Sequence, residues 1–183
     1  TNAWITHGNG APLFVFDGHV DVVPAGDPAL WATPPFEATV RDGKLYARGA
    51  ADMKGSVAAA AVAFARLVQE KPDHPGTLAF LITSDEEGDG HEGTKRVVQK
   101  LKNEGVTIDA CIVGEPSCSR FFGDTIKNGR RGSLNGKVTI RGKAGHVAYP
   151  HLARNPIHES APFFAELASR QWDQGNDYFG PTT

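Results

Sequence analysis

The chain has 183 residues, of which 40% are hydrophobic and 22% are charged, and its formal net charge is −2. This length and apolar content predict one domain, or one domain and part of a second, with a core of its own. The near-neutral charge argues against a nucleic-acid or membrane-surface partner, and no apolar run is long enough to span a bilayer. Two cysteines, Cys111 and Cys118, cannot build a disulfide framework and favour a reducing, cytoplasmic setting.

The net charge conceals an asymmetry between two parts of the chain. Residues 1–118 carry a net charge of −6, and residues 119–183 carry a net charge of +4. The acidic part is suited to gathering cations, and the basic part is suited to attracting an anionic ligand. Ordinary variation between two surfaces explains the same composition, so the asymmetry alone identifies no function.

Strand patterns recur along the first 113 residues. The chain opens on a strand-like stretch at Thr1, and short apolar runs predict buried strands at Pro12–Phe16, Thr77–Thr83 and Asp109–Val113. The third of these strands is expected to bury Cys111 in the core.

Helices and a hairpin are predicted between these strands. Asp42-Gly43 predicts a β-hairpin within Phe36–Arg48, and helices are predicted at Gly55–Glu70 and Gly93–Asn103. The second helix is amphipathic, with three side chains expected to face inward: Val97, Val98 and Leu101. Strands that alternate with helices predict an α/β fold with a mostly parallel sheet and helices on both faces.

The sequence pattern changes after about residue 120. Gly132–Lys143 predicts an exposed antiparallel strand, and Pro156–Arg170 predicts another helix. These elements indicate the beginning of a smaller α+β subdomain, so we expect two domains, at residues 1–130 and 131–183.

Histidine and carboxylate side chains follow the predicted core strands. His19 and Asp21 follow the first strand, Asp85-Glu86-Glu87 the second and Glu115 the third, while Asp52 precedes the long helix. In open α/β sheets, ligands bind at the carboxyl ends of the strands. Each motif alone is more typical of an ordinary feature: a surface hydrogen-bonding pair for His19 and Asp21, a solvated acidic turn for Asp85-Glu86-Glu87 and a strand end for Glu115. Together they predict a site for a divalent metal. One histidine with several carboxylates suits zinc, cobalt or manganese.

Four motifs resemble those of the dinuclear-zinc metallopeptidase family, which includes aminoacylases and carboxypeptidases. They are Gly18–Pro24 (GHVDVVP), Gly49–Gly55 (GAADMKG), Ser84–Gly88 (SDEEG) and Gly114–Pro116 (GEP). Two further segments are more similar to the family's desuccinylating members than to its acetylornithine-deacetylating members: Lys127–Ser133 (KNGRRGS) and Gly145–His158 (GHVAYPHLARNPIH). The resemblance covers essentially the whole chain. It implies a zinc-exopeptidase-like catalytic domain in residues 1–130 and part of a lid or dimerisation subdomain in residues 131–183.

The resemblance assigns four metal ligands. His19 and Glu115 match the ligands of one zinc ion, Asp52 matches the carboxylate that bridges two zinc ions, and Glu87 matches a ligand of the second. Relatives supply a further histidine far downstream, so we expect the second zinc site to be incomplete in this chain.

Other matches imply the catalytic and substrate-binding residues. Glu86 matches the general base, and Asp21 matches the acid that accepts the other ring N–H of His19. The resemblance also implies a cis peptide bond between Asp52 and Met53. In the second subdomain, His146 matches a catalytic lid histidine that reaches across a dimer, while Arg130 and Tyr149 match substrate contacts. Alternatively, Arg130 is a solvated side chain and His146 belongs to a plain turn.

The implied activity is hydrolysis of N-succinyl-LL-2,6-diaminopimelate to succinate and LL-2,6-diaminopimelate in lysine biosynthesis, by a homodimer. Two alternatives remain open: a related deacylase, such as an acetylornithine deacetylase, and a catalytically impaired metal-binding fragment. The chain is shorter than the family's members, and we expect it to be an internal piece with exposed apolar sheet edges. Serine-hydrolase and nucleotide-binding motifs do not occur in the sequence.

Overall fold

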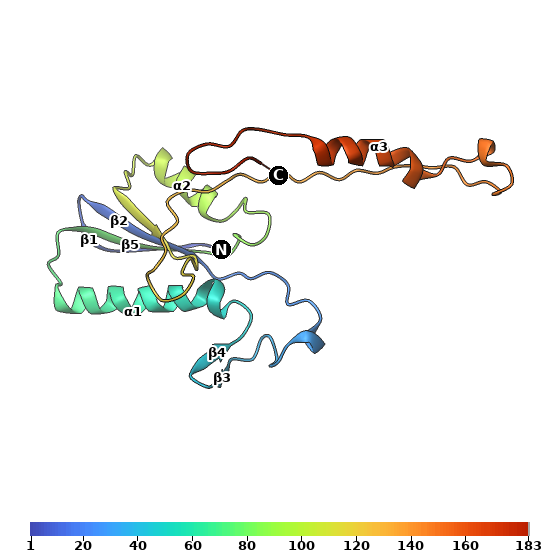
Figure 1. Cartoon of the computed structure of the whole chain (residues 1–183). Helices are drawn as coiled ribbons and strands as arrows, with labels where there is room; N and C mark the ends of the chain where they lie inside the picture. The colour runs from blue at the N-terminus through green and yellow to red at the C-terminus, as the bar shows by residue number, and fades with distance from the viewer. Residues whose placement is uncertain (183) are drawn as a thin grey trace. The chain divides into compact units, whose positions relative to one another are not determined.

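A computed structural model describes residues 1–182 of the chain (Figure 1). The chain divides into two compact units, Thr1–Ile126 and the part that begins at Lys127. This division lies shortly before the boundary expected at residue 130. Among the described residues, no helix combines the length and the apolar character needed to cross a bilayer.

The first unit is built on a four-stranded sheet with the order β1-β5-β2-β6 (Figure 1). Its strands are β1 (Ala3–Asn9), β2 (Leu13–His19), β5 (Gly76–Thr83) and β6 (Ala110–Val113). β2 runs parallel to both of its neighbours, whereas β1 pairs antiparallel with β5. The expected α/β fold with a mostly parallel sheet is therefore confirmed, with one antiparallel strand at its edge.

Two helices, α1 (Gly55–Glu70) and α2 (Thr94–Asn103), lie on opposite faces of this sheet (Figure 1). Successive side chains of a strand point to opposite faces, so the sheet feeds two separate core clusters. The cluster against which α2 packs contains four buried residues: Leu13, Val15, Ala79 and Leu81. The cluster against which α1 packs contains three: Phe16, Met53 and Phe80.

The inward face of α2 is narrower than expected. Leu101 is buried and Val97 packs against the core, but Val98 is 44% exposed, so its predicted inward position is wrong. Val97 and Leu101 are four residues apart and share a face, whereas Val98 is rotated by about 100° from Val97.

The expected burial of Cys111 is also wrong. Cys111 is exposed, and so are its neighbours in β6, including Ile112 and Val113. β6 pairs with β2 on one side and is the last strand of the described sheet, so its second edge has no strand against it there. An apolar run predicts a buried strand, but burial also requires neighbours on every side.

The predicted hairpin is confirmed. β3 (Thr39–Arg41) pairs antiparallel with β4 (Lys44–Tyr46) around a two-residue turn. Asp42 and Gly43 both have positive φ angles, 52° and 72°, as a type I′ turn requires. The described residues also form three short helical turns: η1 (Pro28–Leu30), η2 (Ala50–Lys54) and η3 (Pro150–Leu152).

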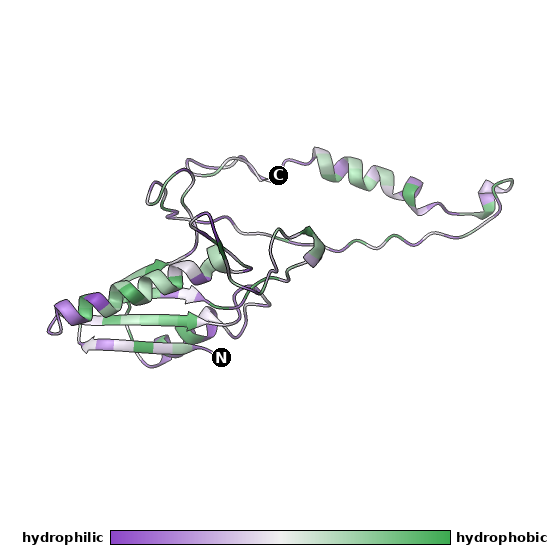
Figure 2. Ribbon diagram, turned by 90° about the horizontal axis from the view of Figure 1, so that it is seen from below, coloured by the Kyte–Doolittle hydropathy of each residue, from purple (hydrophilic) through white to green (hydrophobic). Residues whose placement is uncertain are grey.

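The second unit contains helix α3 (Pro156–Ser169), which confirms the helix predicted there. The helix begins with Pro156 after Asn155, whose side chain accepts a hydrogen bond of 3.0 Å from the Ile157 N–H. The strand predicted at Gly132–Lys143 is wrong, because that segment forms only a single bridge, between Lys143 and Arg154. An alternating pattern becomes a strand only where a partner pairs with it. Much of α3 is hydrophobic in sequence (Figure 2). Several of its large apolar side chains are exposed: Ile157, Phe163, Phe164 and Leu167.

The core cluster beneath α2 predicts a large effect of truncating Leu81, which is 2% exposed and lies opposite Trp4 in the sheet. Leu81→Ala leaves a cavity, so we expect the free energy of unfolding to fall by about 2–5 kcal/mol. Val40→Ala, at a position that is 75% exposed, is the control and should change stability by about 0.5 kcal/mol or less. Urea denaturation of the chain measures both, and equal midpoints for the two variants would contradict the assigned core.

Candidate metal centre

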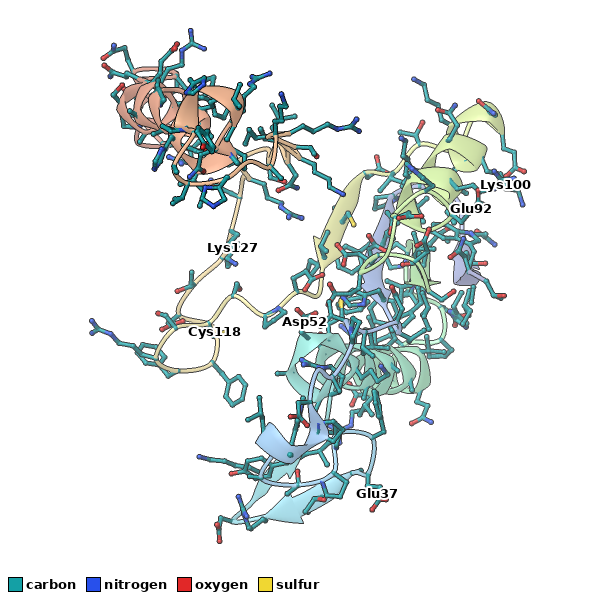
Figure 3. The ribbon with its side chains drawn as sticks, turned by 90° about the vertical axis from the view of Figure 1, so that its right-hand side faces the viewer. Glu37, Asp52, Glu92, Lys100, Cys118 and Lys127 are labelled. Atoms are coloured by element: carbon teal, nitrogen blue, oxygen red, sulfur yellow. The ribbon has the colours of Figure 1, made fainter. Side chains whose placement is uncertain are left out.

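Side chains from four segments meet at the carboxyl ends of the parallel strands. His19 is the last residue of β2, Asp52 lies in η2, Glu86 follows β5 and Glu115 follows β6. Figure 3 shows Asp52 close to the first turn of α1. The sheet topology thus brings together residues that are up to 96 positions apart in the sequence.

The imidazole of His19 is the centre of this group and is 2% exposed. Its Nε2 atom lies 3.1 Å from Asp52 Oδ1, 3.4 Å from Glu115 Oε1 and 3.8 Å from Glu86 Oε2. Three carboxylates from three different segments therefore surround one ring nitrogen.

The second ring nitrogen fixes the tautomer of His19. Nδ1 lies 3.0 Å from the backbone carbonyl oxygen of Asp21, which can only accept, so Nδ1 carries a proton. Nε2 faces the carboxylates, where it donates to Asp52 Oδ1 when protonated and can bind a cation when neutral. Burial disfavours protonation of His19, but the Asp21 carbonyl and the charges of Glu115, Glu86 and Asp21 outweigh it and raise its pKa. A cation bound at Nε2 would neutralise the charge of these carboxylates, as a proton on Nε2 does in its absence.

The role expected for Asp21 needs one correction. Its backbone carbonyl, rather than its carboxylate, is at hydrogen-bond distance from His19, and its Oδ1 atom is 3.5 Å from Nδ1. Its Oδ2 atom accepts hydrogen bonds from the backbone N–H groups of Glu86 and Glu87, at 3.0 and 2.9 Å. Asp21 therefore holds the His19 ring from one side and the backbone of the acidic loop from the other.

Two residues that the sequence analysis left without a role also shape the site. The Asp85 carboxylate accepts hydrogen bonds from the backbone N–H groups of Glu92 and Gly90, at 2.7 and 3.3 Å, and these bonds lower its pKa. Met53 is fully buried, and its sulfur accepts the His19 backbone N–H at 3.3 Å. The implied cis peptide bond between Asp52 and Met53 is present. Asp85 stands in an acidic run, and Met53 is the only methionine, but neither fact signals these contacts.

The remaining carboxylates crowd one another. Burial raises the pKa of Glu115, and the neighbouring charges of Asp52 and Glu86 raise it further, although His19 opposes this. Like charges at this spacing resist joint ionisation, so a cation would stabilise the fully ionised group. One imidazole nitrogen with carboxylate oxygens is a donor set that suits zinc, cobalt or manganese.

Among the described residues, two groups bring three donor atoms within 4.8 Å of one another. The first group is His19, Asp52 and Glu115, the same three residues that the resemblance assigns to one zinc ion. The second is His19, Glu86 and Glu87.

The other predicted site residues belong to the second unit. The rings of His146 and Tyr149 lie 5.8 Å apart between centroids, and His146 Nδ1 accepts the backbone N–H of Ala148 at 3.1 Å. Arg130 is exposed, whereas the guanidinium of its neighbour Arg131 lies over the Phe179 ring. The structure thus brings His146 and Tyr149 together within their own unit.

The contacts of Asp21 predict a measurable loss of metal affinity in Asp21→Asn. The amide oxygen can still accept both backbone N–H groups, but the amide loses the negative charge and turns an N–H donor toward Nδ1 of His19, where Oδ1 now lies. We expect zinc affinity to fall about 10–100-fold, as for other residues that orient metal ligands. Asp27→Asn is the control, because that carboxylate caps η1 through the Ala29 N–H. Competition titration with a chelator measures both variants, and equal affinities would contradict the role of Asp21.

Two curated relatives match the whole chain. It is 59% identical over 182 residues to a succinyl-diaminopimelate desuccinylase of Thiobacillus denitrificans and 57% identical over 183 residues to one of Dechloromonas aromatica. The alignments cover 46% and 48% of these proteins, so the chain spans about half the length of the curated relatives it matches.

Solved structures give a consistent result. Human carnosine dipeptidase 1 is similar over 64% of this chain and 26% of its own, with a TM-score of 0.55 and 31% identity. An M20 family metallo-carboxypeptidase of Sulfolobus solfataricus is similar over 63% of this chain and 26% of its own, with a TM-score of 0.52 and 28% identity. The family pattern of the M20/M25/M40 peptidases matches residues 15–177. The chain therefore belongs to peptidase family M20/M25/M40.

Proposed function

We propose that this chain carries the metal centre of a zinc-dependent amide hydrolase that converts N-succinyl-LL-2,6-diaminopimelate to succinate and LL-2,6-diaminopimelate in lysine biosynthesis. The observation that carries the chemistry is the buried His19 Nε2 atom, which faces three carboxylates at 3.1–3.8 Å. The assignment of this substrate rests on the similarity to two succinyl-diaminopimelate desuccinylases at 57–59% identity.

The donor set fits two zinc ions, for which cobalt or manganese are substitutes. His19, Asp52 and Glu115 would hold the first ion, and Asp52 and Glu87 would contribute to the second. When bound, zinc acts as a Lewis acid on the amide carbonyl and lowers the pKa of water. Support for the first set comes from its three donor atoms, which already lie within 4.8 Å of one another.

Glu86 is the residue we assign as general base. Its carboxylate is partly exposed and lies 3.8 Å from His19 Nε2, so it borders the metal site and faces solvent. Its backbone is fixed by Asp21, which limits how far the carboxylate can move. In this position Glu86 accepts a proton from the attacking water and returns it to the amine that leaves. One side chain therefore both removes and returns the proton.

Recognition of the substrate falls to the basic second unit. A guanidinium group is shaped to bind a carboxylate through two hydrogen bonds, and we assign this role to Arg130 on the succinyl carboxylate. We assign Tyr149 to a further substrate contact. His146 would polarise the scissile carbonyl from the partner in a homodimer, with residues 1–130 as the catalytic domain and residues 131–183 as part of the lid. The two exposed thiols, Cys111 and Cys118, favour a reducing compartment such as the cytoplasm.

The base assignment predicts that Glu86→Gln lowers turnover strongly but retains zinc. Because glutamine cannot accept the proton, succinate release should fall about 10²–10⁴-fold. Asp89→Asn, an exposed acid in the same loop, is the control and should keep its activity. Succinate release and zinc content are measured on the zinc-loaded protein. Normal turnover by Glu86→Gln would remove Glu86 from the mechanism, and faster cleavage of N-acetylornithine by the unchanged protein would contradict the substrate.

The clamp assignment predicts that Arg130→Lys weakens substrate binding. Lysine keeps the positive charge but loses the two-pronged donor geometry, so KM for the succinylated substrate should rise about tenfold with a smaller change in kcat. Arg141→Lys, another exposed arginine of the second unit, is the matched control. Steady-state kinetics separate the two parameters. A KM that responds equally in both variants would mean that general charge, rather than Arg130, attracts the substrate.

A further inference from the structure

Two histidine side chains, His7 and His74, lie next to each other away from the carboxylate centre. His7 belongs to β1, and His74 lies in the segment just before β5. His7 Nδ1 and His74 Nε2 are 2.9 Å apart. In the register of the sheet, His7 lies opposite Leu78 and His19 opposite Thr83, so the two sites are separated by about 17 Å along the strands.

The hydrogen bonds of this pair define which nitrogen can bind a metal. His74 Nδ1 lies 3.3 Å from the Pro75 carbonyl oxygen, so Nδ1 carries the proton and His74 Nε2 presents a lone pair toward His7. A histidine whose other nitrogen donates to a backbone carbonyl is the arrangement found at protein metal ligands, where this bond orients the ring.

The two rings are already spaced for a common ion. Their centroids are 5.1 Å apart, and their planes are inclined by 42°. Two imidazoles bound at about 2.05 Å to a tetrahedral zinc ion have their centroids about 5.2 Å apart. The rings therefore need only to turn in place, so that the two nitrogen atoms separate from 2.9 Å to about 3.3 Å and point to one centre.

The backbone around the pair permits this close approach. Gly8 has a φ angle of +83°, and a Cβ atom there would lie 2.8 Å from His74 Cε1, so a side chain at this position would displace the ring. His7 is exposed and His74 is half-buried, so solvent reaches the pair.

We propose that His7 and His74 together chelate a divalent transition metal ion, and zinc is the ion with which the proposal is tested. On binding, the proton of His7 Nδ1 is lost and the ring takes one at Nε2, so the chelate is neutral apart from the metal. Imidazole ligands suit zinc, copper and nickel. The ion links the edge strand β1 to the segment that leads into β5, and it therefore stabilises the first unit by binding only its folded form.

Zinc chloride titration of the whole chain tests the proposal. At zinc concentrations that just fill the pair, the unchanged chain should bind one equivalent of zinc more than either His7→Gln or His74→Gln, because the remaining histidine supplies a single ligand and forms no chelate. His151→Gln, which removes an exposed histidine from the second unit, is the matched control and should keep the full stoichiometry. Equal zinc stoichiometry in all four proteins would overturn the proposal.

A second measurement does not depend on the folding of the His7 and His74 variants. In the unchanged chain, the ¹⁵N resonances of His7 Nδ1 and His74 Nε2 should shift together on addition of zinc, while His7 Nε2 becomes the protonated nitrogen. The same shifts should persist in Asp52→Asn, which alters only the carboxylate centre. Ring resonances of His7 and His74 that stay unchanged at saturating zinc would show that the pair is only a hydrogen bond, and would overturn the proposal.

Discussion

The architecture of the first unit depends on how a buried imidazole is oriented among carboxylates. His19 is almost inaccessible to solvent, yet its Nε2 atom faces Asp52, Glu115 and Glu86. Placing such a group inside a protein is costly unless each polar atom has a partner. The end of β2, the turn η2 and the segments after β5 and β6 converge at this nitrogen, so three strands of the sheet and one helical turn position the groups around it.

The acidic residues of this region divide into two kinds by what their oxygens contact. Asp21 and Asp85 accept hydrogen bonds from backbone N–H groups, and these bonds hold the loop in place. Asp52, Glu86 and Glu115 instead direct oxygens toward His19 Nε2. The first kind fixes the geometry, and the second is left to bind a cation or move a proton. A site with only the second kind would lack a rigid support.

The sequence could predict those features that depend on local patterns, but not those that depend on which groups lie next to one another in the fold. Apolar runs, turn signals and helix patterns were sufficient for the sheet, for α1–α3 and for the clustering of acids at one edge. The exposure of Cys111 and Val98 and the missing strand at Gly132–Lys143 depend on which neighbours are present, and a local pattern contains no such information. Likewise, Asp21 and Asp85 are chemically the same as a ligand, so only their contacts to backbone N–H groups distinguish them.

The two histidine sites of the first unit differ in charge, and this difference orders their affinities for metal. At the carboxylate centre, the carboxylates around His19 would neutralise a divalent ion, which strengthens its binding. Between His7 and His74, two neutral imidazoles leave the ion with its full charge. Imidazole-only coordination favours the later transition metals, whereas carboxylates also accept manganese. Zinc should therefore fill the carboxylate centre first and the His7–His74 pair only at higher concentration, so the two sites respond to different ranges of free metal.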